Sequence, residues 1–356
     1  MLGSIGDIKK EFDLISCKSD IAYCNPGSYG VTPKSVLKKR LEYLNEWETE
    51  PDKVFFHARS RCEDNLAKVA QFVGAQPDNL VFVENPTTGI NSVVNSLHLT
   101  SNDVIVMASH AYQGINNTMH ALAERHGVHL HIIDIPWPIQ SEDQIVELFV
   151  KACSTIKNIK LVLLDWISCP SGLLFPIHKI IKALQPYQPM ILLDGAHAPG
   201  QIAHLDLENI GVDFFVGCLH KWCYATKSTA ILWVHPKHQA WIKPHMVGVY
   251  YRKTFKNDFF WLGSNDSTRY FCVGEGLDFY QRIGGHQGIS QHIGEMLDFW
   301  EKLLIDSFDV KSAPIPASMR APFMRLVGKF CTLSFFFHIV WTYYIIIFLT
   351  SRIAKI

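Results

Sequence analysis

Short apolar runs and helix-length amphipathic stretches alternate along the chain from about residue 79 to residue 234. The apolar runs are rich in β-branched residues and cover residues 80–83, 104–107, 130–133, 161–164, 190–193, 214–216 and 230–234. Amphipathic stretches such as 116–126, 142–156 and 177–184 lie between them. This alternation predicts an α/β fold with three layers (α/β/α), in which helices cover a mainly parallel sheet.

The composition is typical of a globular protein rather than a disordered or fibrous one. The chain has 356 residues, 48% hydrophobic and 19% charged, which is enough to bury a substantial core. Lys plus Arg and Asp plus Glu both total 33, so the charge balance does not favour a nucleic-acid partner. The nine cysteines include no C-x-x-C pair, and the first residues show no apolar signal region. We therefore expect reduced thiols and a cytoplasmic location.

Polar residues follow several of the predicted strands. In open parallel sheets, ligands bind beyond the carboxyl ends of the strands. Those positions hold Thr87 and Thr88, Ser109 and His110, Asp165, Asp194, and His220 and Lys221. We expect the functional site at this edge of the sheet.

The segment NPTTG at residues 85–89 follows one predicted strand and opens a predicted helix. Backbone amides at a helix N-terminus, the hydroxyls of Thr87 and Thr88 and the flexible Gly89 would form a suitable phosphate cradle. The alternative is that a threonine merely caps the helix.

Asp194 ends one apolar run, and Lys221 lies just past the next one in the sequence CLHKW. A lysine and a carboxylate so placed are what a pyridoxal phosphate enzyme needs. The lysine forms a Schiff base with the cofactor aldehyde, and the carboxylate keeps the pyridine nitrogen protonated. Alternatively, Asp194 caps a helix or pairs with an arginine. Zinc is a competing explanation for the nearby histidines and cysteines, but they lack recognised ligand spacing, and we predict no metal site.

Four strings together resemble the class V aminotransferase family of fold-type I pyridoxal phosphate enzymes: VENPTTGIN, DWISCPSGLLFPI, LLDGAHAPGQI and GCLHKWCYATKST. The likeness covers roughly residues 20–327 and is greatest to the isopenicillin N epimerase-like branch. That branch also resembles cysteine desulfurases and the sulfoxide lyase of ergothioneine synthesis. The resemblance implies pyridoxal 5′-phosphate as cofactor and an amino acid or amino-acid derivative as substrate. It also implies a homodimer, because residues 263–266 resemble a segment that reaches a neighbouring subunit's cofactor phosphate.

The resemblance further implies roles for individual residues around the cofactor ring. Lys221 would be the Schiff-base lysine, and Asp194 would be the partner of the pyridine nitrogen. His197 would contact the phenolic oxygen, and Asp165 is included among the cofactor-binding residues.

The remaining cofactor contacts involve the phosphate and the face of the ring. Thr87, Thr88 and His220 would hold the phosphate. Either Tyr112 or His110 would stack on the ring, and we take Tyr112 as the candidate without excluding His110.

The sequence departs from the family pattern near the expected substrate side. Pro26 follows Asn25 where family members tend to have histidine, and Trp166 stands where another histidine is usual. In relatives, an arginine of the small C-terminal domain usually holds the substrate carboxylate through a bidentate contact. That part of the domain is missing here, so we expect Asn25 and Arg59 to bind substrate, with Arg61 as an alternative.

Residues 330–350 read FCTLSFFFHIVWTYYIIIFLT, 21 residues without a formally charged side chain. Their length and apolarity meet the criterion for a membrane span, which would anchor the protein at its C-terminal end. The competing hypothesis, which we favour, is that residues 328–356 are a translated intron or a mispredicted exon that replaces the rest of the small domain.

These observations predict four parts of the chain: an N-terminal loop segment (1–30), a large cofactor-binding domain (31–250), a truncated small domain (251–327) and an apolar tail (328–356). The predicted function is epimerase-like or C–S lyase chemistry on an amino acid or its derivative. Alternatives are a cysteine desulfurase or aminotransferase of the same family, and a catalytically inactive truncated product.

Overall fold

The computed structural model describes residues 5–12, 25–328 and 344–347. Its helices are α1 (Ile5–Lys10), α3 (Pro26–Tyr29), α4 (Lys34–Thr49), α5 (Pro51–Val73), α6 (Pro86–Ser96), α7 (Gln113–His126), α8 (Glu142–Thr155), α9 (Ile177–Leu184), α10 (Leu219–Trp222), α11 (Phe255–Phe260), α12 (Thr268–Phe271), α13 (Val273–Arg282) and α14 (Gly285–Ser307). Its strands are β1 (Leu80–Val83), β2 (Val104–Ala108), β3 (His129–Ile133), β4 (Ile159–Asp165), β5 (Met190–Gly195), β6 (Phe214–Cys218), β7 (Ala230–Val234), β8 (Lys311–Ser312), β9 (Arg325–Gly328) and β10 (Tyr344–Ile347).

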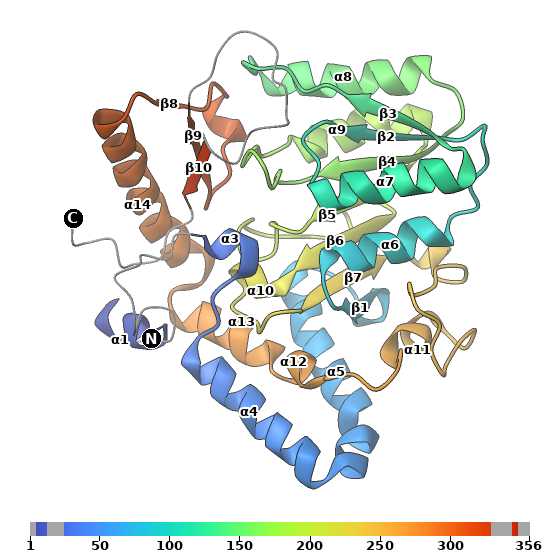
Figure 1. Ribbon diagram of the computed structural model, residues 1–356, viewed down its shortest axis with the longest axis vertical. Helices are drawn as coiled ribbons and strands as arrows, with labels where there is room; N and C mark the ends of the chain where they lie inside the picture. Colours follow the sequence, from blue (N-terminus) through green and yellow to red (C-terminus); the bar gives the residue numbers. More distant parts are fainter. Residues whose placement is uncertain (1–4, 13–24, 329–343, 348–356) are drawn as a thin grey trace.

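A seven-stranded sheet in the order β1-β7-β6-β5-β4-β2-β3 forms the centre of the molecule (Figure 1). Strands β6, β5, β4, β2 and β3 pair in parallel. Strand β7 runs antiparallel to both of its neighbours, β1 and β6. Each of the seven apolar runs forms a strand, and the prediction of a mainly parallel sheet is confirmed.

Successive side chains of each strand enter two different hydrophobic cores. In β1, Leu80 and Phe82 pack in a core with α5, α8 and α9, whereas Val81 and Val83 pack in a second core with α6 and α7. This separation follows from the two-residue repeat of a β-strand. Helices therefore cover both faces of the sheet, and the three-layer arrangement is confirmed.

The segment predicted as an N-terminal loop contains helix where the structure describes it. Helices α1 and α3 both lie within residues 1–30. Asn25 caps α3, since its side chain accepts a hydrogen bond from the Ser28 N–H at 3.3 Å, and Pro26 occupies the first turn. Asparagine at the cap and proline directly after it are a common start of a helix.

The C-terminal part contributes α14 and a small sheet in the order β10-β9-β8. Most of the apolar segment 330–350 lies outside the described residues. The part that is described, Tyr344–Ile347, forms a strand paired with Arg325–Gly328 rather than a helix. Within the ranges 5–12, 25–328 and 344–347, no helix is both long and apolar enough to cross a membrane.

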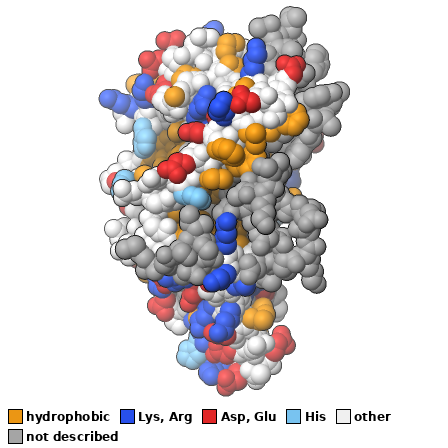
Figure 2. Space-filling model, turned by 90° about the vertical axis from the view of Figure 1, so that its left-hand side faces the viewer, with side chains coloured by type: hydrophobic (Ala, Val, Ile, Leu, Met, Phe, Trp, Pro, Cys, Tyr) orange, Lys and Arg blue, Asp and Glu red, His pale blue; other side chains and the backbone are white. Residues whose placement is uncertain are grey.

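Side chains of both charges are interspersed over the described part of the face shown in Figure 2. Basic and acidic groups alternate there with polar and hydrophobic ones. This distribution agrees with the equal totals of basic and acidic residues in the chain.

Candidate active site

Lys221 and His197 meet at the carboxyl edge of the sheet. Lys221 lies on α10, a short helix that begins where β6 ends, and His197 follows the end of β5. The Nζ atom of Lys221 is 3.0 Å from Nε2 of His197, while Nε1 of Trp222 donates to Nδ1 of the same ring at 3.4 Å. Burial and the charge of Lys221 hold the pKa of His197 well below its ordinary value. The ring is therefore a neutral group that contacts both the amine and the indole.

Asp165 and Asp194 are register partners at the ends of β4 and β5. Their exposed fractions are only 4% and 6%. Burial raises the pKa of Asp194, while the Ala196 N–H, which donates to its Oδ1 at 2.9 Å, and Lys221 act in the opposite direction. Burial and the charge of Asp194 raise the pKa of Asp165 well above its ordinary value. Within the described residues, Oδ2 of Asp165 is buried and has no hydrogen-bond partner.

The N-terminus of α6 lies close to this carboxylate pair. A Cβ on Gly89 would approach Cγ1 of Val216 to 2.7 Å, so glycine allows the helix to pack closely on β6. Val216 is in turn the register partner of Asp194. Asn85 caps the helix by accepting from the backbone N–H of Thr88 at 2.9 Å. The alternative in which a threonine is the cap is therefore wrong, because asparagine already occupies that position.

His220 is held within the turn that carries Lys221. Its Nδ1 lies 3.1 Å from the carbonyl oxygen of Thr229 and 3.2 Å from Sγ of Cys218. Burial lowers the pKa of His220 to about 4. The segment that follows Asn25 reaches the same turn, since a Cβ on Gly30 would lie 1.6 Å from the His220 carbonyl oxygen. A phosphate contact of His220 stays a prediction.

His110 and Tyr112 have different environments. His110 is buried: its Nε2 accepts from Nε1 of Trp137 at 3.1 Å, and its Nδ1 lies 3.3 Å from Oγ of Ser171. Tyr112 is 46% exposed at the start of α7, where its ring lies against Gly114. These environments favour Tyr112 as the stacking residue, because the buried ring of His110 is already stacked on Trp137, with ring centroids 5.5 Å apart.

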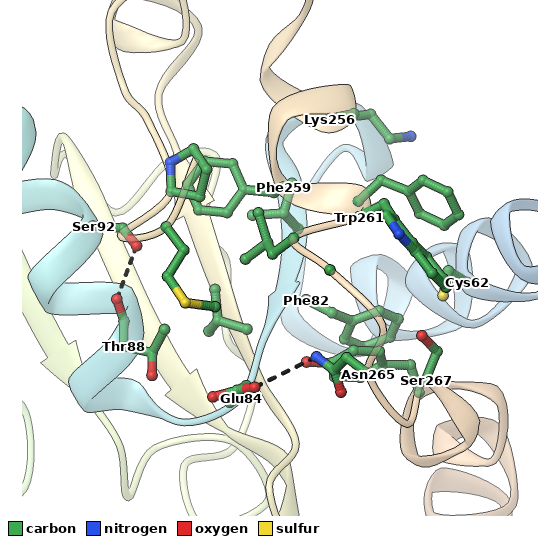
Figure 3. A pocket seen from close by; sticks show the side chains of 18 of the residues that line it. Cys62, Phe82, Glu84, Thr88, Ser92, Lys256, Phe259, Trp261, Asn265 and Ser267 are labelled. Carbon is green, nitrogen blue, oxygen red and sulfur yellow. Dashed lines mark hydrogen bonds between the residues drawn. The ribbon is translucent and has the colours of Figure 1, made fainter. Parts of the chain in front are cut away.

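A pocket of about 160 Å³ lies beside β1 (Figure 3). Two of the predicted site residues, Thr88 and Arg59, line it. Lys221, Asp194 and His197 do not line it. Arg59 and Thr88 are 29 positions apart in the chain, and only the fold brings both to one pocket.

The segment that was expected to reach a neighbouring subunit also borders this pocket. Gly263 and Asn265 line it, and Nδ2 of Asn265 lies 3.5 Å from Oε1 of Glu84. In Figure 3, the side chains of Asn265 and Glu84 lie at one end of the pocket.

The two candidate substrate arginines also differ. The Arg59 guanidinium lies 4.5 Å from the ring centroid of Phe260 and 3.6 Å from a Glu63 carboxylate oxygen. Arg61 makes a bidentate contact with Glu46 at 2.9 and 2.8 Å. The donors of Arg61 are thus already used within the chain, and Arg59 is the more accessible cation.

Three functional neighbours were missed in the sequence. Trp222 orients His197, and Ser171 holds His110. The pKa of the partly exposed thiol of Cys169 is raised by burial and lowered by Lys221, which places this thiol near the amine. Ser171 and Cys169 both belong to the string DWISCPSGLLFPI, so the signal was present, but only the fold shows which groups they contact.

The family model described as "Aminotransferase class-V" matches residues 29–310. The chain therefore belongs to the class V aminotransferase family, as its four motifs indicated. The cofactor of this enzyme family is pyridoxal 5′-phosphate, and the chain belongs to the enzymes that use it.

Three curated relatives illustrate the range of activities in the family. The chain is 25% identical to a probable chloroplastic L-cysteine desulfhydrase of Arabidopsis thaliana, covering 86% of this chain and 67% of the relative. It is 27% identical to the hercynylcysteine sulfoxide lyase of Schizosaccharomyces pombe, covering 82% and 75%. For the isopenicillin N epimerase of Streptomyces clavuligerus, identity is 25%, and coverage is 63% and 56%.

Solved structures share the fold. A C-DES mutant with glycine covalently linked to its PLP cofactor aligns with a TM-score of 0.78 at 19% identity, covering 89% of this chain and 85% of that chain. The cysteine desulfurase of Thermococcus onnurineus NA1 aligns with a TM-score of 0.73 at 18% identity, covering 92% and 84%. At these identities the likeness concerns the fold alone.

Proposed function

We propose that this protein is a pyridoxal phosphate-dependent C–S lyase that acts on cysteine or a cysteine derivative. The observation that carries the proposal is the arrangement of the Lys221 amine, the neutral His197 ring and the buried Asp194 carboxylate at one edge of the sheet. Sulfur chemistry is supported by the relatives named L-cysteine desulfhydrase and hercynylcysteine sulfoxide lyase.

The residues present fit the cofactor chemically. Asp194 is a buried carboxylate whose Oδ1 accepts from the Ala196 N–H, and a further hydrogen-bond donor would stabilise its negative charge. A protonated pyridine nitrogen is such a donor, and it is the natural partner of a buried carboxylate. Thr87 and Thr88, at the N-terminus of α6, would hold the phosphate, and Tyr112 would cover the ring.

When bound, pyridoxal phosphate withdraws electrons from the α-carbon of an attached amino acid and weakens the bonds at that carbon. The Lys221 amine, once exchanged for the substrate amine, would take the α-proton at its Nζ atom. His197 keeps that nitrogen in place through the 3.0 Å contact. Asp194 would supply the negative charge that keeps the pyridine nitrogen protonated. After loss of the α-proton from a cysteine derivative, the electron pair at the α-carbon would form a double bond to the β-carbon, and sulfur would leave as a thiolate with the electrons of the broken C–S bond.

The substrate carboxylate requires a positive or donating group. We propose Arg59 and the Asn25 segment for this task. Gly30 brings the Asn25 segment against the Lys221 turn, and the side chain of Arg59 is 38% exposed.

Two other reactions of the family are second candidates. Epimerisation needs reprotonation of the same α-carbon, and a relative with that name exists. A desulfurase requires an accessible persulfide-forming cysteine. Among the described residues, Cys62, Cys153, Cys218, Cys223 and Cys272 are buried and Cys169 is only partly exposed, which favours the lyase.

We also propose that two copies associate. Met246, Val247 and Val249 are 52%, 67% and 78% exposed, and Met246 lines the pocket that the 263–266 segment borders. Apolar side chains exposed this far and next to each other are typical of an interface. Sedimentation of the purified protein would show a dimer, and a monomer at micromolar concentration would contradict this proposal.

The experiment that tests the enzyme is reconstitution of the purified protein with pyridoxal phosphate. We expect a visible absorption band that Lys221→Ala abolishes and that the control Lys227→Ala, at an exposed lysine on the loop after α10, retains. With L-cysteine, the loaded protein should release sulfide. Inversion of the α-carbon without sulfide would support the epimerase. A lysine-dependent band that no amino acid alters would support a catalytically inactive product.

A further inference from the structure

The two carboxylates at the ends of β4 and β5 have unequal partners. Asp194 has an N–H donor, that of Ala196, and a nearby cation, Lys221. Asp165 is 4% exposed, and its Oδ2 has no partner among the described residues. The neighbour that influences Asp165 electrostatically is Asp194, a group of the same charge. The two carboxylates thus share a buried environment, but only Asp194 has partners that stabilise its negative charge.

We propose that Asp165 is a permanently neutral carboxylic acid that donates its proton as a hydrogen bond to Asp194, and is a positioning residue for that carboxylate. The proposal rests on the function proposed above only for the role of Asp194. The protonation state itself follows from the geometry.

Two charges at adjacent register positions of parallel strands would repel each other in a buried environment. The energetic cost of burying a carboxylate without a donor or cation is large, and such a group takes up a proton instead. Since Asp194 already has Ala196 and Lys221 as partners, the proton resides on Asp165. As an acid, Asp165 gains the donor that its unpartnered Oδ2 lacks as a carboxylate.

Other titratable groups lie at the same edge of the sheet as the pair. They are Cys169 on the loop after β4, His197 after β5, Cys218 at the end of β6, Lys221 on α10 and His110 after β2. Burial lowers the pKa of His197 and His110 and raises the pKa of Cys169 and Cys218, so these four groups are uncharged at neutral pH. Lys221 is the neighbouring cation, and its effect is on Asp194.

The consequence for the site is a single, fixed negative charge. Asp194 would accept one hydrogen bond from the Ala196 N–H and one from Asp165, which orients its carboxylate. A charge held in this way meets the ring nitrogen of the proposed cofactor without having to reorganise.

The first test is infrared difference spectroscopy of the full chain at neutral pH, without added cofactor. The wild type should show the carbonyl stretch of a protonated carboxylic acid, which is lost in Asp165→Asn and kept in Asp194→Asn. Loss of the band in Asp194→Asn only, or no such band in the wild type, would overturn the proposal. Because no cofactor is used, this outcome is independent of whether the enzyme proposal holds.

The second test uses variants that separate hydrogen-bond donation by the side chain at position 165 from its charge. Asn resembles the neutral acid and can donate, whereas Leu cannot. In the pyridoxal phosphate-loaded protein, Asp165→Asn should keep the cofactor dissociation constant and the pH midpoint of the visible band, and Asp165→Leu should weaken binding by roughly tenfold, the scale of one hydrogen bond to a charged group. If Asp165→Asn behaves like Asp165→Leu, Asp165 acts through its charge and the proposal fails.

Circular dichroism checks that both variants fold. If one does not, ¹³C-labelled aspartate in the wild type must still show a carboxyl group that stays protonated at neutral pH.

Discussion

The Nζ atom of Lys221 lies 3.0 Å from Nε2 of His197, although the two residues are 24 positions apart in the chain. They meet because β5 and β6 are parallel neighbours, so that both strands end at the same edge of the sheet. The contact pairs an amine with a ring that burial keeps neutral. Four predictions follow from this edge of the sheet and its surroundings.

Replacing His197 should impair the attachment of the cofactor. In His197→Leu, the Lys221 amine loses the group that holds it in place, and we expect the visible band of the reconstituted protein to form roughly tenfold more slowly, which corresponds to about 1.4 kcal/mol. Stopped-flow absorbance measures this rate. His197→Gln, which keeps a polar group, should recover part of it, and His98→Leu, at an exposed histidine, should not change it. An unchanged rate in His197→Leu would show that the contact does not position the amine.

Gly30 should not tolerate a side chain. Its φ is +69°, and a Cβ would lie 1.6 Å from the His220 carbonyl oxygen, so Gly30→Ala must displace the turn that carries Lys221. We expect a loss of at least about 1 kcal/mol in the free energy of unfolding, measured in urea, and weaker cofactor binding. The matched control is Gly294→Ala on helix α14, where a Cβ meets nothing within 4 Å. That change should be neutral or stabilising by about 0.5–1 kcal/mol. Equal behaviour of the two variants would contradict the close approach.

The pH dependence of stability should have opposite signs for Asp165 and Asp213. The pKa of Asp165 is raised in the folded state. Its contribution to the free energy of unfolding is therefore complete below the unfolded pKa of about 4 and is lost as the pH rises. Asp165→Asn should therefore become more stable relative to the wild type as pH rises above about 4.

Asp213 is the internal control for this measurement. It is paired with Lys237 and His238 at 2.6 and 2.8 Å, and despite burial these contacts lower its pKa. The contribution of Asp213 to the free energy of unfolding is present above the unfolded pKa and is lost in acid. Asp213→Asn should therefore lower the stability most at neutral pH and least in acid. Urea unfolding between pH 3 and pH 8 measures both differences, and the same sign for both variants would contradict the assignment for Asp165.

Acid should lower the free energy of unfolding because His110 is buried. Burial lowers its pKa from 6.5 to about 4, so the folded state resists a proton that the unfolded state accepts. The contribution of His110 to the free energy of unfolding is complete above pH 6.5. It falls by about 3 kcal/mol in total as the pH decreases towards 4. His110→Gln should flatten this part of the pH profile, whereas His98→Gln should leave it unchanged. A wild-type profile that is already flat between pH 6.5 and 4 would contradict the buried, neutral ring.

Much of the fold could be predicted because it depends on patterns that are local in the chain. The run 190–193 reads as a buried strand by itself, and Asp194 directly after it belongs to the carboxyl edge of any parallel sheet. The position of Lys221 at the same edge needed only one further step, since it follows the next apolar run. The helix at Pro26–Tyr29 was missed, because a single turn has no amphipathic repeat to recognise.

The sequence by itself determined the three-layer fold, the family and the residues at the strand ends, because alternation and short motifs are properties of neighbouring residues. Only the tertiary structure decided which of those residues meet. It paired Lys221 with His197, Asp165 with Asp194, and His110 with Trp137 and Ser171. It also placed Arg59 in a pocket beside β1. These contacts depend on strand order and on burial, and it is burial without a donor that leaves Asp165 to take up a proton.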